Sequence, residues 1–205
     1  DELNSISAGA RWHDAAERWS LRIEAYASQW FDMQSDYVLP TGLIATRNSG
    51  NALIYGVELD GTWAPTPDWS VAAGFDAQHA KAEVAGAADN ALPVVPQYKG
   101  HASVAHRFAL AHLPLEATLR ANLTGPAHVT IYSGVVGNMP TRLMVDGALS
   151  TRLGGWRIGL GVQNLLNSRA DSFAYGNPFS IRNAAQHTPP RPRTISLTVS
   201  WRLGD

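Results

Sequence analysis

The stretch Thr194–Leu203, which reads TISLTVSWRL, decides the fold class of this chain. Every second residue from Ile195 onward is apolar, and the residues between them are threonine, serine or arginine. Successive side chains of a β-strand point to opposite faces, whereas a helix repeats every 3.6 residues. The run therefore predicts a strand with one apolar face and one polar face.

The same alternation recurs along most of the chain, in the runs 156–163, 143–150, 115–124, 102–110, 69–78, 53–63, 19–28 and, more weakly, 4–12. His106 is an exception, because it falls on the apolar side of its run. Together the runs predict about nine strands, with little helical periodicity anywhere. We expect an all-β, antiparallel chain that forms a single segment over residues 1–205.

The connections between these runs alternate in length. Short turns are expected near 13–18, 64–68, 111–114 and 152–155, and long polar loops near 32–51, 79–97, 125–140 and 164–192. Strict alternation places every long loop at one end of the sheet, with Asp1, and every short turn at the other end, with the C-terminus. This asymmetry is typical of transmembrane β-barrels, which have short periplasmic turns and long extracellular loops.

The composition excludes several other classes of protein. Charged residues make up 16% of the chain and the formal net charge is −1, so no strong field attracts nucleic acid. The chain has no cysteine, which excludes disulfides and thiolate metal sites. No apolar run reaches the roughly 18 residues that a membrane helix needs. The chain starts at Asp1 without an apolar leader, so we expect a mature piece or a fragment.

Alternation alone also fits a soluble β-sandwich, but strand length and tryptophan placement favour a lipid-facing sheet. The runs reach about 10 to 12 residues, enough to cross a bilayer when tilted. The tryptophans on the apolar face all lie beside short turns or the C-terminus, as in an interfacial girdle. The predicted membrane-interface girdle comprises Trp12, Trp19, Trp63, Trp69, Trp156 and Trp201.

The charged residues complete this prediction. The apolar faces carry no charge in mid-strand, as lipid contact requires when a midplane Arg or Lys costs about 2–4 kcal/mol. The predicted lumen-facing residues are Arg22, Glu24, Glu58, Asp60, Asp76, Arg107, Glu116, Arg120, Asp146 and Arg157. We therefore predict an antiparallel transmembrane β-barrel in the bacterial outer membrane, with lipid against its apolar face.

Three segments carry a resemblance to a known family. Asn48–Trp63 (NSGNALIYGVELDGTW) resembles a barrel strand of TonB-dependent outer-membrane receptors, and Gly161–Ser168 (GVQNLLNS) resembles the end of their penultimate strand. The stretch Tyr175–Leu197 is similar to their last long loop and terminal strand. The resemblance covers essentially the whole chain in a consistent order and falls on the C-terminal portion of the barrel.

The resemblance implies a barrel of about 22 strands closed by an N-terminal plug domain. Such receptors take up ferric siderophores, cobalamin, haem or sugars with the inner-membrane TonB complex. We expect this chain to form the wall and extracellular loops of such a receptor, for a ferric siderophore or a similar iron complex. The plug, which contacts the TonB complex, and the remaining barrel strands would lie outside this chain.

Ligand contacts are expected at the long-loop end, where charge and aromatic area suit an anionic iron chelate. The candidates are Arg47, Tyr132, Tyr175 and Arg182, although a merely solvated rim is the competing interpretation. His79, His101, His128 and His187 lie near the same end without metal-ligand spacing, so no metal site or cofactor is expected. No motif gathers a catalytic set, so we expect no enzyme.

Two alternatives remain open at this stage. Nine strands is an odd number for a closed bacterial barrel. Either the chain is a fragment of a larger barrel, or the run 4–12 is not a strand and a small eight-stranded barrel acts as a structural anchor. The second alternative is a soluble β-sandwich that serves as a binding module.

Overall fold

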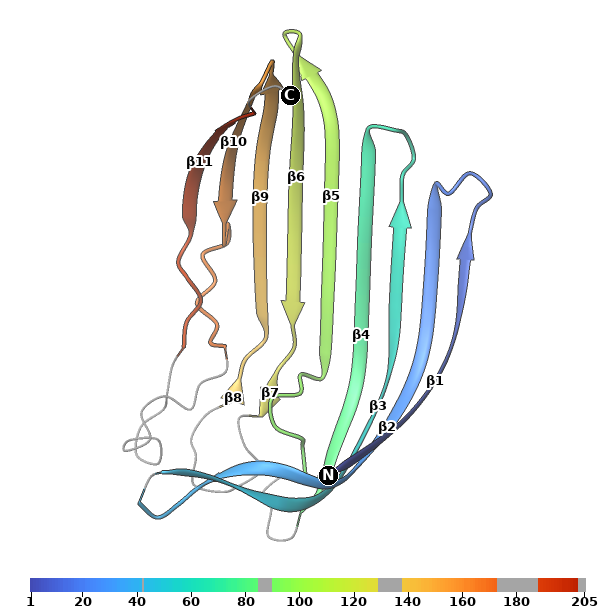
Figure 1. The fold of residues 1–205 in the computed structure, drawn as a ribbon, viewed down its shortest axis with the longest axis vertical. Helices are drawn as coiled ribbons and strands as arrows, with labels where there is room; N and C mark the ends of the chain where they lie inside the picture. Colours follow the sequence, from blue (N-terminus) through green and yellow to red (C-terminus); the bar gives the residue numbers. More distant parts are fainter. Residues whose placement is uncertain (42, 85–89, 129–137, 173–187, 203–205) are drawn as a thin grey trace.

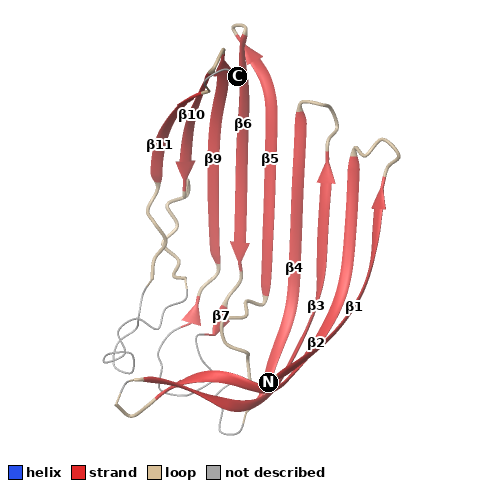
Figure 2. Cartoon of the chain, in the orientation of Figure 1, coloured by secondary structure: helices blue, strands red, loops and turns tan. Residues whose placement is uncertain are grey.

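A computed structural model describes residues 1–41, 43–84, 90–128, 138–172 and 188–202 of the chain. Within these ranges the chain forms strands, turns and irregular segments, without a helix (Figure 2). The strands are β1 (Glu2–His13), β2 (Trp19–Val38), β3 (Ile44–Trp63), β4 (Trp69–Glu83), β5 (Tyr98–Leu110), β6 (Leu113–Thr124), β7 (Ala127–His128), β8 (Asn138–Met139), β9 (Arg142–Leu153), β10 (Trp156–Gln163) and β11 (Thr194–Trp201).

Nine of these strands form one antiparallel sheet in the order β1-β2-β3-β4-β5-β6-β9-β10-β11 (Figure 1). The short strands β7 and β8 pair with each other in the connection between β6 and β9. Each of the nine strands overlaps one of the runs predicted from the alternation, including the weak first run, which is β1. The all-β, antiparallel prediction is confirmed.

Both alternative architectures are wrong. The eight-stranded barrel required the first run not to be a strand, but β1 pairs with β2 from Glu2 to His13. Within the described ranges β1 and β11 are the two edges of the sheet and do not pair, so the sheet is open. A β-sandwich needs a second large sheet over the apolar face, and the described part of the chain contains only the β7–β8 pair besides the main sheet.

The two ends of the sheet differ as predicted. Figure 1 shows the short turns and the C-terminus at one end, and the long connections and the N-terminus at the other. The predicted lengths of the first two long loops were partly wrong. β2 continues to Val38, β3 begins at Ile44 and β4 continues to Glu83, so parts of both predicted loops are strand. The residues 32–51 therefore form mostly a hairpin, because pairing between two backbones does not require apolar side chains.

This hairpin extension bends away from the sheet at a bulge (Figure 1). The register between β2 and β3 shifts on either side of Met33. Asp32 has a φ of 51° and Gly50 a φ of 122°, both in the left-handed region. A bulge of this kind re-aims a strand pair. The bend turns residues 34–48 across the long-loop end of the sheet.

The apolar core is small and lies at the long-loop end, beside this bend. Its buried members are Met33, Ala52, Ala82 and Leu92, with Trp30 packed against them. The segment that carries Leu92 follows β4 through backbone hydrogen bonds, including one from Leu92 N–H to the Ala80 carbonyl at 3.2 Å. The core fixes the root of the hairpin extension and leaves most of the apolar surface of the sheet uncovered.

Candidate functional site: the two faces of the sheet

The apolar face of the sheet is its exposed face. Val57, Leu119 and Leu197 are 45%, 48% and 70% exposed, whereas Glu58 and Asp60, the polar neighbours of Val57 and Leu59, are partly buried. Monomeric soluble proteins rarely expose contiguous apolar patches of this size. Such a patch normally marks a surface that contacts another protein or a membrane. The distribution is thus the reverse of that expected for a sheet whose apolar side packs into a core. Within the described residues, no helix is long and apolar enough to span a membrane.

All six predicted girdle tryptophans are exposed, at the short-turn ends of their strands. Trp19 lies directly opposite Trp63, and Trp156 opposite Trp201, whose rings lie 6.0 Å apart. His106 joins this band, because its ring stacks on Trp69 at 3.9 Å and an interplanar angle of 18°. The exceptional place of this histidine in its run is explained by the stacking.

The strand register places the ten predicted lumen-facing residues on one face, opposite the exposed leucines and valines. These residues are Arg22, Glu24, Glu58, Asp60, Asp76, Arg107, Glu116, Arg120, Asp146 and Arg157. We call this side of the sheet the polar face. The ten residues form two groups rather than one cluster, the first on β2–β4 and the second on β5–β10.

Arg22 is the centre of the first group. Its guanidinium donates a hydrogen bond to Glu24 on the same strand and lies 3.9 Å from Glu58 Oε2 and 3.8 Å from Asp60 Oδ2 on β3. His101 on β5 places its Nε2 3.9 Å from Asp60 Oδ1. Three carboxylates thus surround one arginine, and the polar face is acidic at this point.

Two glycines allow these side chains to meet across an intervening strand. Gly74 lies between Asp60 and His101, and a Cβ there would come within 2.4 Å of the aspartate Oδ1 and 2.3 Å of the imidazole. Gly56 plays the same role for Tyr26, whose hydroxyl donates across β3 to Asp76 at 3.0 Å and to Gln78 at 3.1 Å. Sequence analysis missed these bridges, although glycine among the polar positions of long strands was a visible signal.

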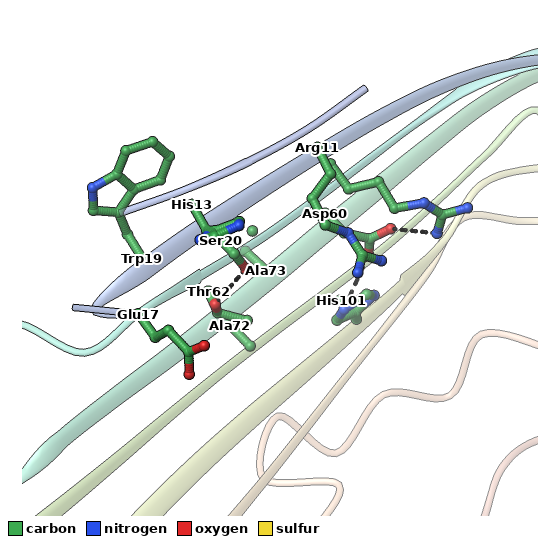
Figure 3. A pocket seen from close by; sticks show the side chains of 12 residues that line it. Arg11, His13, Glu17, Trp19, Ser20, Asp60, Thr62, Ala72, Ala73 and His101 are labelled. Atoms are coloured by element: carbon green, nitrogen blue, oxygen red, sulfur yellow. Dashed lines mark hydrogen bonds and ion pairs between the residues drawn. The ribbon is translucent and has the colours of Figure 1, made fainter. Parts of the chain in front are cut away.

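A hollow of about 810 Å³ opens on the polar face between this group and the short turns (Figure 3). Asp60 and His101 line one part of it, and the Ser20 and Thr62 hydroxyls, 2.7 Å apart, line another. The lining contains arginine, histidine and carboxylate groups together with apolar side chains such as Ala72 and Ala73. Such a surface suits water or a polar protein segment better than an apolar ligand.

The second group contains a structural carboxylate. Asp146 Oδ1 accepts a hydrogen bond from the backbone N–H of Asn164 at 2.8 Å. The side chain of Asn164, 1% exposed, donates to the carbonyls of Ser168 and Arg191 at 3.0 and 2.9 Å and accepts from the N–H of Ser168 at 2.7 Å. Asp146 and Asn164 therefore anchor the root of the last long connection.

The short turn between β1 and β2 is organised around Asp14, whose carboxylate accepts hydrogen bonds from the N–H of Trp19 and from the Arg18 guanidinium, both at 3.0 Å. Desolvation raises the pKa of the Asp14 carboxyl, but these hydrogen bonds together outweigh it and hold the pKa below its ordinary value. The turn is therefore held by a charged carboxylate.

Of the four predicted ligand contacts, only Arg47 lies within the described residues. It is an exposed residue of β3, opposite Ser35 in the hairpin extension. Tyr132, Tyr175 and Arg182 lie outside the described residues, so whether the four side chains meet stays a prediction. Among the predicted loop-end histidines, His79 lies on the apolar face and its ring is 5.4 Å from that of Tyr55.

Comparison with known proteins identifies the family. Residues 2–165 match the family model for the TonB dependent receptor-like β-barrel. The chain belongs to this family. Its members are outer-membrane proteins of Gram-negative bacteria, so this chain is a segment of an outer-membrane β-barrel. No curated protein sequence matches it significantly.

Solved receptor structures share the fold at low sequence identity. The ferric yersiniabactin uptake receptor FyuA from Yersinia pestis is 22% identical, with a TM-score of 0.80 over 96% of this chain and 29% of its own. The siderophore receptor PiuA from Acinetobacter baumannii is 15% identical, with a TM-score of 0.76 over 97% of this chain and 28% of its own. The copper transporter OprC is 15% identical, with a TM-score of 0.74 over 97% and 31%. The chain thus spans under a third of the length of these proteins.

Proposed function

We propose that this chain forms part of the wall and the extracellular loops of a TonB-dependent uptake receptor for a ferric siderophore or a similar iron complex. The observation that carries the proposal is the two-sided sheet, with an exposed apolar face and a charged polar face on strands of up to 20 residues. Membership of the receptor barrel family supports the transport role. The ferric yersiniabactin and siderophore receptors among the structural neighbours support an iron complex as the ligand.

In this proposal the polar face lines the lumen and the apolar face contacts lipid. The band of tryptophans lies at the periplasmic interface, where the amphipathic indole ring is most stable. The plug domain occupies the lumen against the charged groups of the polar face and connects the receptor to the TonB complex. The plug and the further strands that close the barrel belong to parts of the receptor outside this chain.

The ligand is held at the opposite, long-loop end. Arg47, Tyr132, Tyr175 and Arg182 supply guanidinium charge and aromatic surface, which suit an anionic iron chelate. The bent β2–β3 hairpin supports this assignment, because it carries Arg47 on a paired strand segment across that end of the sheet. In this proposal the receptor binds the iron complex and takes it up, and it catalyses no reaction on that complex.

The test uses a receptor chimera, in which residues 1–205 replace the corresponding C-terminal strands of the ferric yersiniabactin receptor while its plug and remaining strands are kept. Cells that depend on the chimera for iron are grown with single ferric siderophores, with and without TonB. The proposal expects TonB-dependent growth on at least one siderophore. Exchanging Tyr175 and Arg182 for alanine should weaken binding of that siderophore at normal surface display.

Arg18, in a short turn at the other end of the sheet, provides the matched control. Arg18→Ala should leave siderophore binding unchanged. A chimera that inserts with its plug but supports no siderophore uptake contradicts the iron assignment. Copper-dependent accumulation in its place would favour a copper ligand, which the similarity to the copper transporter OprC would then explain.

A further inference from the structure

The apolar face of β1–β4 ends, toward the long loops, in a row of mostly polar side chains. The members of this row lie directly opposite one another across the four strands and are, in order, Asn4, Gln29, Leu53 and Lys81. Directly opposite residues of an antiparallel pair point to the same face, so the polar members share the face of the exposed Leu53. We call Asn4, Gln29 and Lys81 the outer row.

The outer row lies at the depth of a second membrane interface. Gln29 follows the girdle residue Trp19 by ten positions on the same strand. Ten residues of a strand span about 33 Å, which at a tilt of about 40° crosses about 25 Å of membrane, the height of the apolar band of a barrel. The rings of Tyr55 and His79, two residues nearer the girdle than Leu53 and Lys81, fit this depth, because amphipathic rings collect at interfaces.

The two interfaces carry different chemical groups. The girdle presents indoles, whereas the outer row presents two amides and one ammonium group. Gln29 and Lys81 are exposed, and within the described ranges their side chains have no hydrogen bond or ion pair. An amide both donates to and accepts from hydroxyl groups, and a lysine ammonium binds phosphate. The outer row therefore matches a headgroup that contains both sugar hydroxyls and phosphate.

An apolar hollow opens beside the outer row. It has a volume of about 300 Å³ and is lined by Ile6, Ala27, Leu53, Asn4 and Gln29, among others. The small side chain of Ala27 leaves this space, because the larger Ile6 lies directly opposite it and Gln29 follows it on the same face. The hollow thus places apolar walls next to two amides. A hydrocarbon chain fits between these walls while its headgroup reaches the outer row.

We propose that the outer row and this hollow bind an acylated, phosphorylated sugar lipid of the outer leaflet. An acyl chain occupies the hollow, sugar hydroxyls pair with Asn4 and Gln29, and a phosphate pairs with Lys81. The inference rests on the proposed function only because that function makes the long-loop end extracellular.

Two carboxylates on the same face restrict where the phosphate lies. Glu2 and Glu83 are each two residues further from the membrane than Asn4 and Lys81, and Glu2 accepts a hydrogen bond from Asn4 Nδ2 at 3.0 Å. Carboxylates accept hydrogen bonds from sugar hydroxyls but repel phosphate. They therefore favour a phosphate at the level of Lys81 and sugar above it.

Native mass spectrometry of the receptor chimera in detergent tests the headgroup contact. The probes are lipid A, which is an acylated and phosphorylated glucosamine disaccharide, its dephosphorylated form, and phosphatidylglycerol. Lys81→Gln should weaken lipid A binding about fivefold, the effect of one lysine at an anionic lipid surface, and leave the dephosphorylated form unaffected. Lys99→Gln is the matched control, because Lys99 is the only other lysine and lies opposite Asp76 on the polar face. It should leave lipid A binding unchanged.

Ala27→Phe tests the hollow, because the larger ring fills it. This substitution should weaken binding of both forms of lipid A, whereas Ala25→Phe, on the same face but outside the hollow, should not. Equal lipid A binding in Lys81→Gln and Lys99→Gln, unchanged binding in Ala27→Phe, or equally strong binding of phosphatidylglycerol would each overturn the proposal. Siderophore uptake is measured with the same chimera. Uptake without lipid A binding overturns only this inference, whereas lipid A binding without uptake counts against the proposed function.

Discussion

Replacing Asn164 with alanine should loosen the root of the last long connection without unfolding the sheet. The Asn164 side chain makes three hydrogen bonds, two to the carbonyls of Ser168 and Arg191 and one from the N–H of Ser168. Each is worth about 1 kcal/mol net, and the site is buried, so water does not readily replace them. Asn164 also has a φ of 50°, where alanine costs roughly a further 1 kcal/mol. The expected loss is about 4 kcal/mol of local stability.

Asn167 provides a matched control in the same segment. Its φ is 52°, so alanine carries the same backbone cost, but its side chain accepts only one hydrogen bond, from the N–H of Arg193 at 3.2 Å. Asn167→Ala should therefore cost about 2 kcal/mol. The difference of about 2 kcal/mol corresponds to a roughly 30-fold difference in the local opening equilibrium.

Hydrogen exchange of the Leu165 amide measures this opening. That amide donates to the Val145 carbonyl at 2.7 Å, and neither substitution removes its acceptor. In the receptor chimera, exchange should be fastest in Asn164→Ala, intermediate in Asn167→Ala and slowest without substitution. Equal exchange in the two variants would refute the assignment of the extra stability to the Asn164 hydrogen bonds.

Three further predictions concern other parts of the sheet. Gly56→Ala should cost about 1–3 kcal/mol and exceed Gly74→Ala, because the new Cβ would lie 2.7 Å from the backbone oxygen of Ala77, whereas at Gly74 it meets only movable side-chain ends; equal melting temperatures would contradict this. Since folding lowers the pKa of Asp14, its carboxylate stabilises the turn above pH ~4 and this contribution is lost as the pH falls through the folded-state pKa. Asp14→Asn should therefore weaken the dependence of stability on pH in the acid range. An acid-unfolding curve that the substitution leaves unchanged would exclude a stabilising role for the Asp14 carboxylate. Brominated lipids should quench the six girdle tryptophans at one interfacial depth, and two or more of them near the bilayer centre would exclude a girdle.

The sequence pattern predicted the strands well because each one separates two environments. A strand between lipid and a polar interior must alternate strictly, so every apolar–polar run corresponded to a strand of the sheet. The strand predicted from the weak run 4–12 was correct for the same reason, and it corresponds to β1. The position of the six tryptophans beside the short turns was also visible in the sequence, because it follows from the order of residues along the chain alone.

Features that depend on pairing between distant residues could not be predicted in this way. The residues 34–48 lack the apolar–polar alternation, yet their backbones pair in the bent extension of β2 and β3. Asp146 looked like one more polar-face charge until its hydrogen bond to Asn164 was visible. The position of Arg152 directly opposite Arg157 needs the β9–β10 register, which a count of residues around a short turn leaves uncertain by one position.

The central claim is that one face of the sheet contacts lipid and the other does not, and spin labels on β3 test it most directly. The chain has no cysteine, so single cysteines at 57, 58, 59 and 60 can be labelled in an otherwise cysteine-free receptor chimera in bilayers. Labels at Val57 and Leu59 should be accessible to oxygen, which concentrates in lipid. Labels at Glu58 and Asp60 should show lower oxygen accessibility. Equal accessibility at all four positions, or the opposite alternation, would contradict the account.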